Sequence, residues 1–210
     1  MRLVCMSDTH NQIHKFEFAI PDGDVFVFTG DLSGTSHDWC GLNLFKEFLN
    51  GLPHRHKIVI AGNHDFLFEK QKGSDLLCAK NIHYLEDSDV TIDGVRFYGT
   101  PYQPVFFDWA FNVENPVRLR RKWVQIPDET NVLLTHCAPY GILDRTVRGD
   151  FTGCPMLRDR VRELNQLKVH CFGHIHESYG VLEKEGVTYI NSSTCDINYL
   201  PVNPPIVIDI

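Results

Sequence analysis

The chain has 210 residues, of which 43% are hydrophobic and 22% charged, and its formal net charge is −7. This length and apolar content are enough for one α/β domain with its own core, so we expect a single domain over residues 1–210. The negative charge argues against a protein that binds long nucleic acid through a basic surface. The sequence has no run near the roughly 20 apolar residues of a membrane span, so we expect no membrane contact.

Short β-branched runs alternate with helical patterns along the chain, which predicts an α/β fold. The predicted strands are Leu3–Met6, Val25–Thr29, Lys57–Ala61, Asp89–Ile92, Val95–Tyr98, Val132–Thr135, Val169–Phe172, Val187–Asn191 and Ile206–Ile208. The predicted helices are Asp38–Asn50, Phe66–Lys80 and Met156–Leu167. Because most strands are apolar throughout, we expect two packed sheets covered by helices. The aromatic stretch 101–127 either lines a cleft wall or is a packed surface excursion.

Five polar clusters each follow an apolar run of the sequence. They are Asp8-Thr9-His10, Gly30-Asp31, Gly62-Asn63-His64-Asp65, Thr135-His136 and Gly173-His174-Ile175-His176. Each cluster alone is a weak signal, since a single Asp or His at a strand end is more often a cap or a packing residue. In α/β sheets, however, sites assemble at the carboxyl ends of strands, and all five clusters fall there. Jointly they predict a site for two divalent ions.

The residue types suit such a site. Asp8 and His10 are two apart, so in an extended segment their side chains would point the same way and could hold one ion. The two oxygens of Asp31 could bridge two ions, although a turn or helix cap is the simpler role for an isolated Asp. The amide oxygen of Asn63 is a hard ligand that suits Mn, Mg, Fe or Zn.

Histidines supply the remaining donors. His136, His174 and His176 would offer imidazoles from two later strand ends. His64 adjoins Asn63 but points elsewhere, so we expect it to meet the substrate as an acid. Asp65 either caps the next helix or orients His64, and we favour the cap.

The seven cysteines are odd in number, scattered and free of any Cys-x-x-Cys pair. This pattern predicts a reducing, cytoplasmic setting. Cys137 adjoins His136 and could be a redox or metal group, but plain packing is the favoured interpretation.

In this order, the five clusters resemble the signature of the calcineurin-like metallophosphoesterase superfamily, over a span from Asp8 to Asp196. Further segments are similar to its metallophosphoesterase domain-containing subgroup: Phe97–Pro101, Leu134–Gly141, Phe172–Glu177, Tyr189–Cys195 and Asn203–Ile206. Some members of that subgroup lack the first His of the Gly-His-x-His block. This chain keeps it as His174, which favours activity.

The resemblance implies a four-layer α/β/β/α sandwich with two packed mixed sheets, and a dinuclear site of divalent ions. One ion would be held by Asp8, His10, Asp31 and His176. The other would be held by Asp31, Asn63, His136 and His174. Manganese is the first expectation, with Fe, Mg or Zn as alternatives.

The implied reaction is phosphoester hydrolysis by a hydroxide that bridges the ions, with His64 protonating the leaving oxygen. Related phosphatases carry a Gly-Asp-x-x-x-Arg-Gly block whose Arg clamps a dianionic phosphate. Here the block reads Gly30-Asp31-Leu32-Ser33-Gly34-Thr35. A small phosphodiester, including cyclic nucleotides and their 2′,3′ forms, is therefore the expected substrate. The candidate substrate contacts are Asn63, His64, Tyr140, Arg145 and Arg148, although a solvated loop explains the two Arg equally well.

Three alternatives stay open. A phosphomonoesterase or protein phosphatase would need a dianion clamp from other residues. A nuclease would need an elongated basic groove, and a non-catalytic scaffold would be expected to lack some ligands. The sequence contains no pattern that specifies an oligomeric state.

Overall fold

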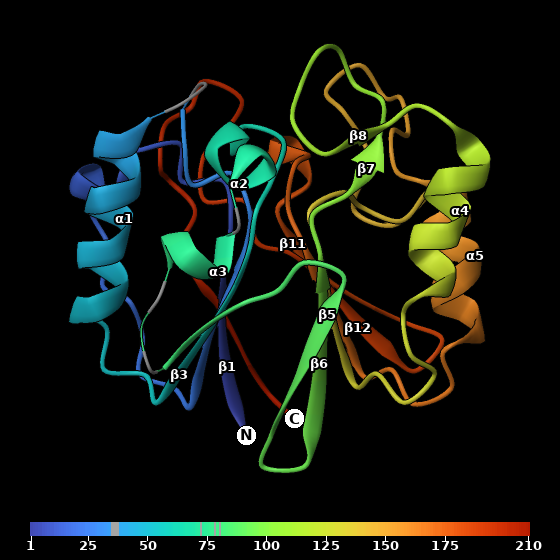
Figure 1. The fold of residues 1–210 in the computed structure, drawn as a ribbon, viewed down its shortest axis with the longest axis horizontal. Coiled ribbons are helices and arrows are strands. Elements are labelled where there is room, and N and C mark those ends of the chain that lie inside the picture. The colour runs from blue at the N-terminus through green and yellow to red at the C-terminus, as the bar shows by residue number, and fades with distance from the viewer. Residues whose placement is uncertain (35–37, 72, 78, 80) are drawn as a thin grey trace.

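The structure is a computed structural model that describes residues 1–34, 38–71, 73–77, 79 and 81–210. Two sheets face each other in the middle of the molecule, and helices cover the outer face of each sheet (Figure 1). This order confirms the predicted four-layer α/β/β/α sandwich. Among the described residues, we find no helix that combines the length and the apolar character needed to cross a membrane.

The first sheet has five strands in the order β13-β1-β2-β3-β4. Their bounds are β1 Arg2–Met6, β2 Val25–Thr29, β3 His56–Ile60, β4 Ile82–Tyr84 and β13 Ile206–Asp209. The first four strands run parallel, and β13 pairs antiparallel with β1. The sheet is therefore mixed, and the carboxyl ends of β1, β2 and β3 meet at one edge.

The second sheet has six strands in the order β11-β12-β10-β9-β6-β5. Their bounds are β5 Ser88–Ile92, β6 Val95–Thr100, β9 Val132–Thr135, β10 Val169–Phe172, β11 Gly180–Lys184 and β12 Val187–Asn191. The central strands β6, β9, β10 and β12 are parallel, while β5 and β11 are antiparallel edges. Asp93 and Gly94, both at positive φ, form the tight turn of the expected β5–β6 hairpin.

The alternation of side chains along each strand builds the core. On β1, Leu3 and Cys5 pack between the two sheets, whereas Val4 and Met6 face the helices. Every residue of β2 is buried. Strands covered on both faces were the expectation from their continuous apolar sequences, and the structure confirms it.

Two helical predictions differ from the structure. The predicted helix Phe66–Lys80 is instead α2, Phe66–Lys70, and α3, Gly73–Leu76, and Lys80 lies outside the described residues. The break comes at Gln71, which is extended. Gly73 begins α3 close to the Tyr84 ring, where a Cβ would lie 2.2 Å from it. Helix α1, Trp39–Gly51, is close to its prediction, and Asp38 caps it by accepting from the amide of Gly41.

The second sheet is covered by α4, Pro116–Val124, and α5, Pro155–Glu163. Helix α5 ends four residues before the predicted Leu167, because Leu164 leaves the helical conformation while still packing in the same core. Helix α4 was not predicted within the aromatic stretch 101–127. The Asn115 cap followed by a proline at the first helical position was the signal for it.

The same stretch also contains the short parallel strands β7, Gln103–Pro104, and β8, Asn112–Val113. Leu119 and Trp123 of α4 are buried against the second sheet. Both open interpretations of the stretch therefore hold in part: its end packs as core, and residues 103–106 line a cavity beside the polar clusters.

Candidate metal centre

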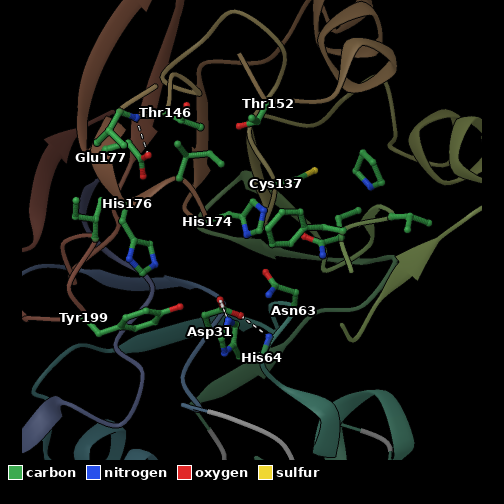
Figure 2. A pocket seen from close by; sticks show the side chains of 17 residues that line it. Asp31, Asn63, His64, Cys137, Thr146, Thr152, His174, His176, Glu177 and Tyr199 are labelled. Atoms are coloured by element: carbon green, nitrogen blue, oxygen red, sulfur yellow. Dashed lines mark hydrogen bonds and ion pairs between the residues drawn. The ribbon is translucent and has the colours of Figure 1, made fainter. Parts of the chain in front are cut away.

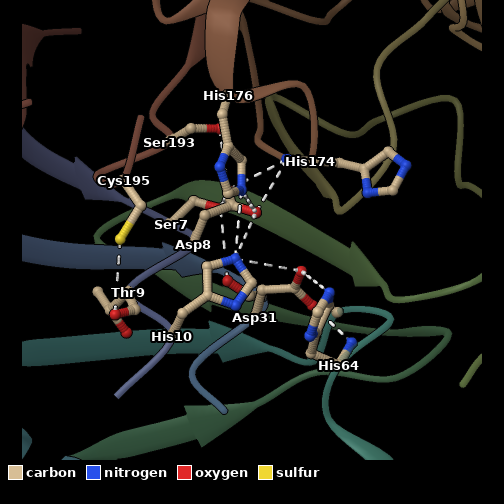
Figure 3. A network of polar contacts seen from close by, with 12 residues as sticks. Ser7, Asp8, Thr9, His10, Asp31, His64, His174, His176, Ser193 and Cys195 are labelled. Carbon is tan, nitrogen blue, oxygen red and sulfur yellow. Dashed lines mark hydrogen bonds and ion pairs between the residues drawn. The ribbon is translucent and has the colours of Figure 1, made fainter. Parts of the chain in front are cut away.

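The five polar clusters come together where the strands of both sheets end. Asp8, Asp31 and Asn63 follow β1, β2 and β3 of the first sheet. His136 follows β9, and His174 and His176 follow β10, in the second sheet. Figure 3 shows side chains from both sheets turned toward one another. The site is therefore built across the inter-sheet boundary.

The backbone at these positions is unusual. Asp8, His10, Asp31 and His174 have φ angles of 51°, 41°, 58° and 69°. Non-glycine residues in the left-handed region cost roughly 1–2 kcal/mol each, so the surrounding fold must hold them there. The expected extended geometry of Asp8-x-His10 is therefore wrong. Tight turns after the strand, and not alternation along it, bring the two side chains together.

Asp8, His10 and His176 form the first group of donors. His176 Nε2 lies 3.5 Å from Asp8 Oδ1, and His10 Nε2 lies 4.0 Å from the same oxygen. The Nε2 atoms of His10 and His176 are 3.2 Å apart. Donors at 2.0–2.2 Å from a common ion are roughly 3–3.6 Å apart, so this group has nearly the spacing that one ion requires.

Asp31, Asn63, His136 and His174 form the second group. His136 Nε2 is 2.8 Å from Asn63 Oδ1 and 3.4 Å from Asp31 Oδ2. The same Asp31 oxygen is 3.8 Å from His10 Nε2 in the first group. One atom of Asp31 thus faces both groups, which is the placement that a ligand shared by two ions requires. Asp31, His136 and His174 can also direct three donor atoms at one point.

Backbone carbonyls set the tautomers of three of these histidines. The Nδ1–H groups of His10, His136 and His176 donate to the carbonyl oxygens of Ser33, Thr29 and Asp196, at 3.0, 2.9 and 2.9 Å. Because a carbonyl can only accept, a neutral ring then presents the Nε2 lone pair to the site. Lone pairs of His10 and His176 facing each other repel unless a proton or a metal ion lies between them. The donor set therefore fits divalent cations.

The carboxylates are held as firmly as the imidazoles. The hydroxyls of Ser7 and Ser193 both donate to Asp8 Oδ2, and the amide of His174 donates to the same carboxylate. The amide of His64 donates to Asp31 Oδ1 at 2.8 Å, leaving Oδ2 free to face the donors. Each carboxylate thus has one oxygen available to an ion.

Burial and charge shift the pKa values within the cluster. Burial lowers the pKa of His10 to about 4, and burial together with His136 lowers that of His174 to about 4. Burial also opposes charge on His136 and His176. There, the carboxylates of Asp31 and Asp8 outweigh it and raise each pKa to about 9. Below pH 9 the metal-free cluster therefore keeps two protons that cations would displace.

Metal-free protein should lose stability as the pH rises from 6.5 to 9. The folded pKa values of His136 and His176 lie above the unfolded value of 6.5, so their contribution is complete below 6.5 and disappears as the pH passes 9. We expect a loss on the order of a few kcal/mol. Thermal unfolding of chelator-treated protein should show a falling Tm over this range, and metal-loaded protein should not. An unchanged Tm in the metal-free protein would contradict the assignment.

Asp65 neither caps helix α2 nor orients His64. Its side chain caps no amide of α2, and the ring nitrogen Nδ1 of His64 donates instead to the Gly34 carbonyl at 2.6 Å. The buried Asp65 carboxylate accepts from the amides of Asp31, Ser33 and Gly62, at 2.9, 3.0 and 2.8 Å. The turn that returns the Asp65 amide to the Gly62 carbonyl directs the side chain this way. Asp65 thereby fixes the loop that presents Asp31.

Replacing Asp65 with alanine should destabilise the protein by about 2–5 kcal/mol, because the buried amides that donate to its carboxylate lose their acceptor. Asp65→Asn keeps one acceptor oxygen and should cost less. Urea unfolding of the metal-free proteins measures both effects without a contribution from bound ions. Equal midpoints for wild type and Asp65→Ala would show that these hydrogen bonds do not hold the loop.

His64 lies at the edge of the site. Its Nε2 is 3.9 Å from Asp31 Oδ2, and its ring stacks on Trp109 with centroids 4.1 Å apart. His10, Asp31 and His64 can also direct three donor atoms at one point. The geometry therefore places His64 within reach of a group bound at the ions, as an acid or as a further ligand.

A cavity of about 420 Å³ opens beside the two groups (Figure 2). Asp31, Asn63, His64, His174 and His176 line it from the metal side. Its other walls come from three segments, namely Gln103–Phe106, the Thr146–Thr152 loop and the loop that carries Ile197 and Tyr199. The cavity can therefore hold a small molecule in contact with the candidate ligands.

Tyr140, Arg145 and Arg148 do not line this cavity. Tyr140 packs on Phe151, with the Arg158 guanidinium 5.6 Å from its ring. Arg145 lines a shallow neighbouring pocket, and Arg145 and Arg148 are both exposed. Their role as substrate contacts stays a prediction that the geometry does not favour.

Tyr199 and Gln103 line the cavity but were not among the predicted site residues. Tyr199 contacts His10 edge-on, with centroids 4.8 Å apart, from a loop whose Asp196 carbonyl anchors His176. Neither residue stands in a motif of metal ligands. Only the arrangement of the loops brings them to the site.

A family model described as "Calcineurin-like phosphoesterase" matches residues 1–178. Human metallophosphoesterase domain-containing protein 1 is 39% identical over the whole of this chain, which covers 71% of that protein. A UPF0046 protein of Caenorhabditis elegans is 36% identical over 93% of this chain and 70% of its own length.

Solved structures show the same fold at low sequence identity. The structure of TT1561 from Thermus thermophilus aligns with a TM-score of 0.60 and 11% identity, over 90% of this chain and 88% of that one. A structure titled as a novel archaeal phosphodiesterase aligns with a TM-score of 0.52 and 18% identity, over 100% and 93% of the two chains. The family uses a dinuclear centre of divalent metal ions, and the donor groups described above fit one. The chain belongs to the calcineurin-like phosphoesterase family, whose members hydrolyse phosphoesters.

Proposed function

We propose that the protein is a dinuclear-metal phosphodiesterase that hydrolyses small phosphodiesters. One observation carries the proposal: among the described residues, no Lys or Arg lines the cavity beside the metal site. A phosphomonoester brings two negative charges, and phosphatases need cationic side chains to neutralise them. A diester brings one charge, which two bound ions can balance.

The chain's own residues have distinct tasks in this reaction. Asp31 would hold both ions. Asp8, Asn63 and the histidines at positions 10, 136, 174 and 176 would complete their coordination. When bound, two divalent ions supply positive charge at the phosphoryl oxygens and lower the pKa of a water molecule. His64, whose ring stacks on Trp109, would deliver a proton to the leaving oxygen. The aromatic walls would keep bulk water away from the departing group.

The proposed substrate class, metal and cellular compartment each have separate support. Cyclic nucleotides fit a cavity of about 420 Å³ and carry the required single charge. Manganese suits a donor set of imidazoles with carboxylate and amide oxygens, as do Fe and Zn. The six cysteines in the described residues are all free thiols, which suits a reducing compartment such as the cytoplasm. The archaeal structure of similar fold is titled a phosphodiesterase, but at 18% identity it indicates the fold alone.

The test compares a diester with a monoester. Protein stripped of metal and reloaded with Mn²⁺ is assayed for initial rates on bis-p-nitrophenyl phosphate and p-nitrophenyl phosphate. We expect metal-dependent turnover that favours the diester. A preference for the monoester would indicate a phosphatase, and equal rates on long single-stranded nucleic acid would indicate a nuclease. No turnover with both ions bound would favour a non-catalytic scaffold.

A further inference from the structure

One part of the cavity wall is apolar. Val105 and Phe106, on the loop after β7, form an apolar wall, and Val147 lies in the opposing loop. Phe106 meets the ring of His174 edge-on, with centroids 5.5 Å apart. This wall therefore begins next to a candidate metal ligand. A substituent of a substrate held at the ions would extend along it.

Gln103 places a polar atom within this apolar surrounding. The residue is 1% exposed and lines the cavity, and its Oε1 atom has no hydrogen-bond partner. Thr146, on the opposing loop, also lines the cavity with a buried hydroxyl that has no partner. Buried polar atoms are nearly always hydrogen-bonded, so an unpartnered acceptor on a residue that lines a cavity indicates a missing donor.

The hydrogen-bond network fixes which atom of the Gln103 amide is free. Asn112 Oδ1 accepts from the Phe106 amide, and Asn112 Nδ2 donates to the carbonyls of Phe106 and Phe107. The Asn112 amide can adopt only this orientation, since both of its ends are defined. Its Oδ1 then takes a donor from Gln103 Nε2, at 3.2 Å. The Gln103 carbonyl oxygen is thus the atom left without a partner, and it can only accept.

We propose that Gln103 is a specificity-determining residue: its side-chain carbonyl accepts a hydrogen bond from an N–H or O–H group on the edge of a flat, uncharged substituent that packs against Phe106 and Val105. The inference rests on the proposed phosphodiesterase function and names the kind of ester group that the site selects. An apolar wall alone discriminates weakly among substituents of similar size. A buried acceptor discriminates more strongly, because a substrate without the donor leaves it unpaired.

The first part of the experiment varies the substituent and keeps p-nitrophenolate as the leaving group. The probes are the methyl, phenyl, 3-aminophenyl and 4-aminophenyl p-nitrophenyl phosphates. We expect phenyl to exceed methyl in kcat/KM by about tenfold, through contact with the wall. At least one aminophenyl isomer should exceed phenyl by about another tenfold. Its N,N-dimethyl analogue, which keeps the ring but has no N–H, should lose that advantage.

The second part varies the protein. Gln103→Met removes the acceptor while keeping side-chain length. It should abolish the aminophenyl advantage over phenyl, while the metal content stays near wild type. Gln103→Asn withdraws the amide by one methylene and should reduce the same advantage. If Gln103→Met does not fold, this second variant tests whether the Gln103 carbonyl accepts from the substrate. Gln125→Met, at the exposed end of α4, is the matched control and should change nothing.

Calorimetry separates this inference from the proposed function. Methyl 3-aminophenyl and methyl 4-aminophenyl phosphates have no good leaving group, so their Kd values are measured without turnover. Tighter binding of one of them than of methyl phenyl phosphate, lost in Gln103→Met, supports the inference even if no diester is hydrolysed. Equal Kd values in wild type, or an advantage that persists in both Gln103 variants, overturns it. If these binding differences are observed but no diester is hydrolysed, only the phosphodiesterase proposal is contradicted.

Discussion

Replacing Asp31 with alanine should empty both metal positions and lower turnover on the order of 10³-fold or more. The reason is the placement of one oxygen, Oδ2, which lies 3.4 Å from His136 Nε2 and 3.8 Å from His10 Nε2. Asp31 is grouped both with His10 and His64 and with His136 and His174 as a candidate ligand. Metal content after gel filtration and calorimetric titration with Mn²⁺ measure the effect directly. Both should show that neither ion is retained.

The control for Asp31 is Asp108→Ala. Asp108 is an exposed carboxylate on the loop between Phe107 and Trp109, so its loss changes the net charge by the same amount. This variant should keep two ions and wild-type turnover. If Asp31→Ala retained two tightly bound ions, the shared-ligand assignment would be wrong. Loss of a single ion would place Asp31 in one coordination sphere only.

Replacing His64 with alanine should leave both ions bound and slow the hydrolysis of diesters with poor leaving groups by about 10²–10⁴-fold. His64 is tied by Nδ1 to the Gly34 carbonyl, so its Nε2 is the atom that faces the site. An alkoxide that leaves without a proton is costly, whereas p-nitrophenolate needs little assistance. Rates over a series of leaving groups should therefore show a steeper dependence on leaving-group pKa in His64→Ala than in wild type.

The control for His64 is His14→Ala, an exposed histidine that belongs to none of the five clusters. It should alter neither metal content nor the leaving-group dependence. Equal rate losses for good and poor leaving groups in His64→Ala would count against the acid role. Loss of an ion would instead show that His64 is a ligand together with His10 and Asp31.

The positions of the candidate ligands could be predicted because the ends of the strands can be recognised in the sequence. Runs such as Val25–Thr29 and Val132–Thr135 match the observed β2 and β9 residue for residue. Once parallel strands are placed, their carboxyl ends share an edge, and the polar residues that follow must meet. The local geometry was not predictable in the same way. Asp8 and His10 have left-handed backbone, and although Asp and His are enriched in that region, only a few per cent of non-glycine residues adopt it, so the residue types alone do not indicate it.

Other differences also come from contacts distant in sequence. The helix expected from Phe66 breaks at Gln71, and the next helix begins at Gly73 against the ring of Tyr84, a residue of the neighbouring β4. Asp65 looks like a cap because it precedes a helix, yet the amides it satisfies belong mostly to the loop after β2. Gln103 could not be selected from its sequence, since only the Asn112 network leaves its carbonyl free. In each case a distant partner outweighs the local pattern.

The division of the ligands between two sheets has a further consequence. Asp8, Asp31 and Asn63 are carried by one sheet and the late histidines by the other, so the spacing of the two halves depends on the apolar layer between them. That layer works as a spacer. A side chain enlarged at Ile58 or Val169, both in that layer, would separate the halves without touching a ligand. Substitutions in the apolar layer between the sheets are therefore expected to change ion affinity. Such substitutions could change which metal is preferred while every ligand is retained.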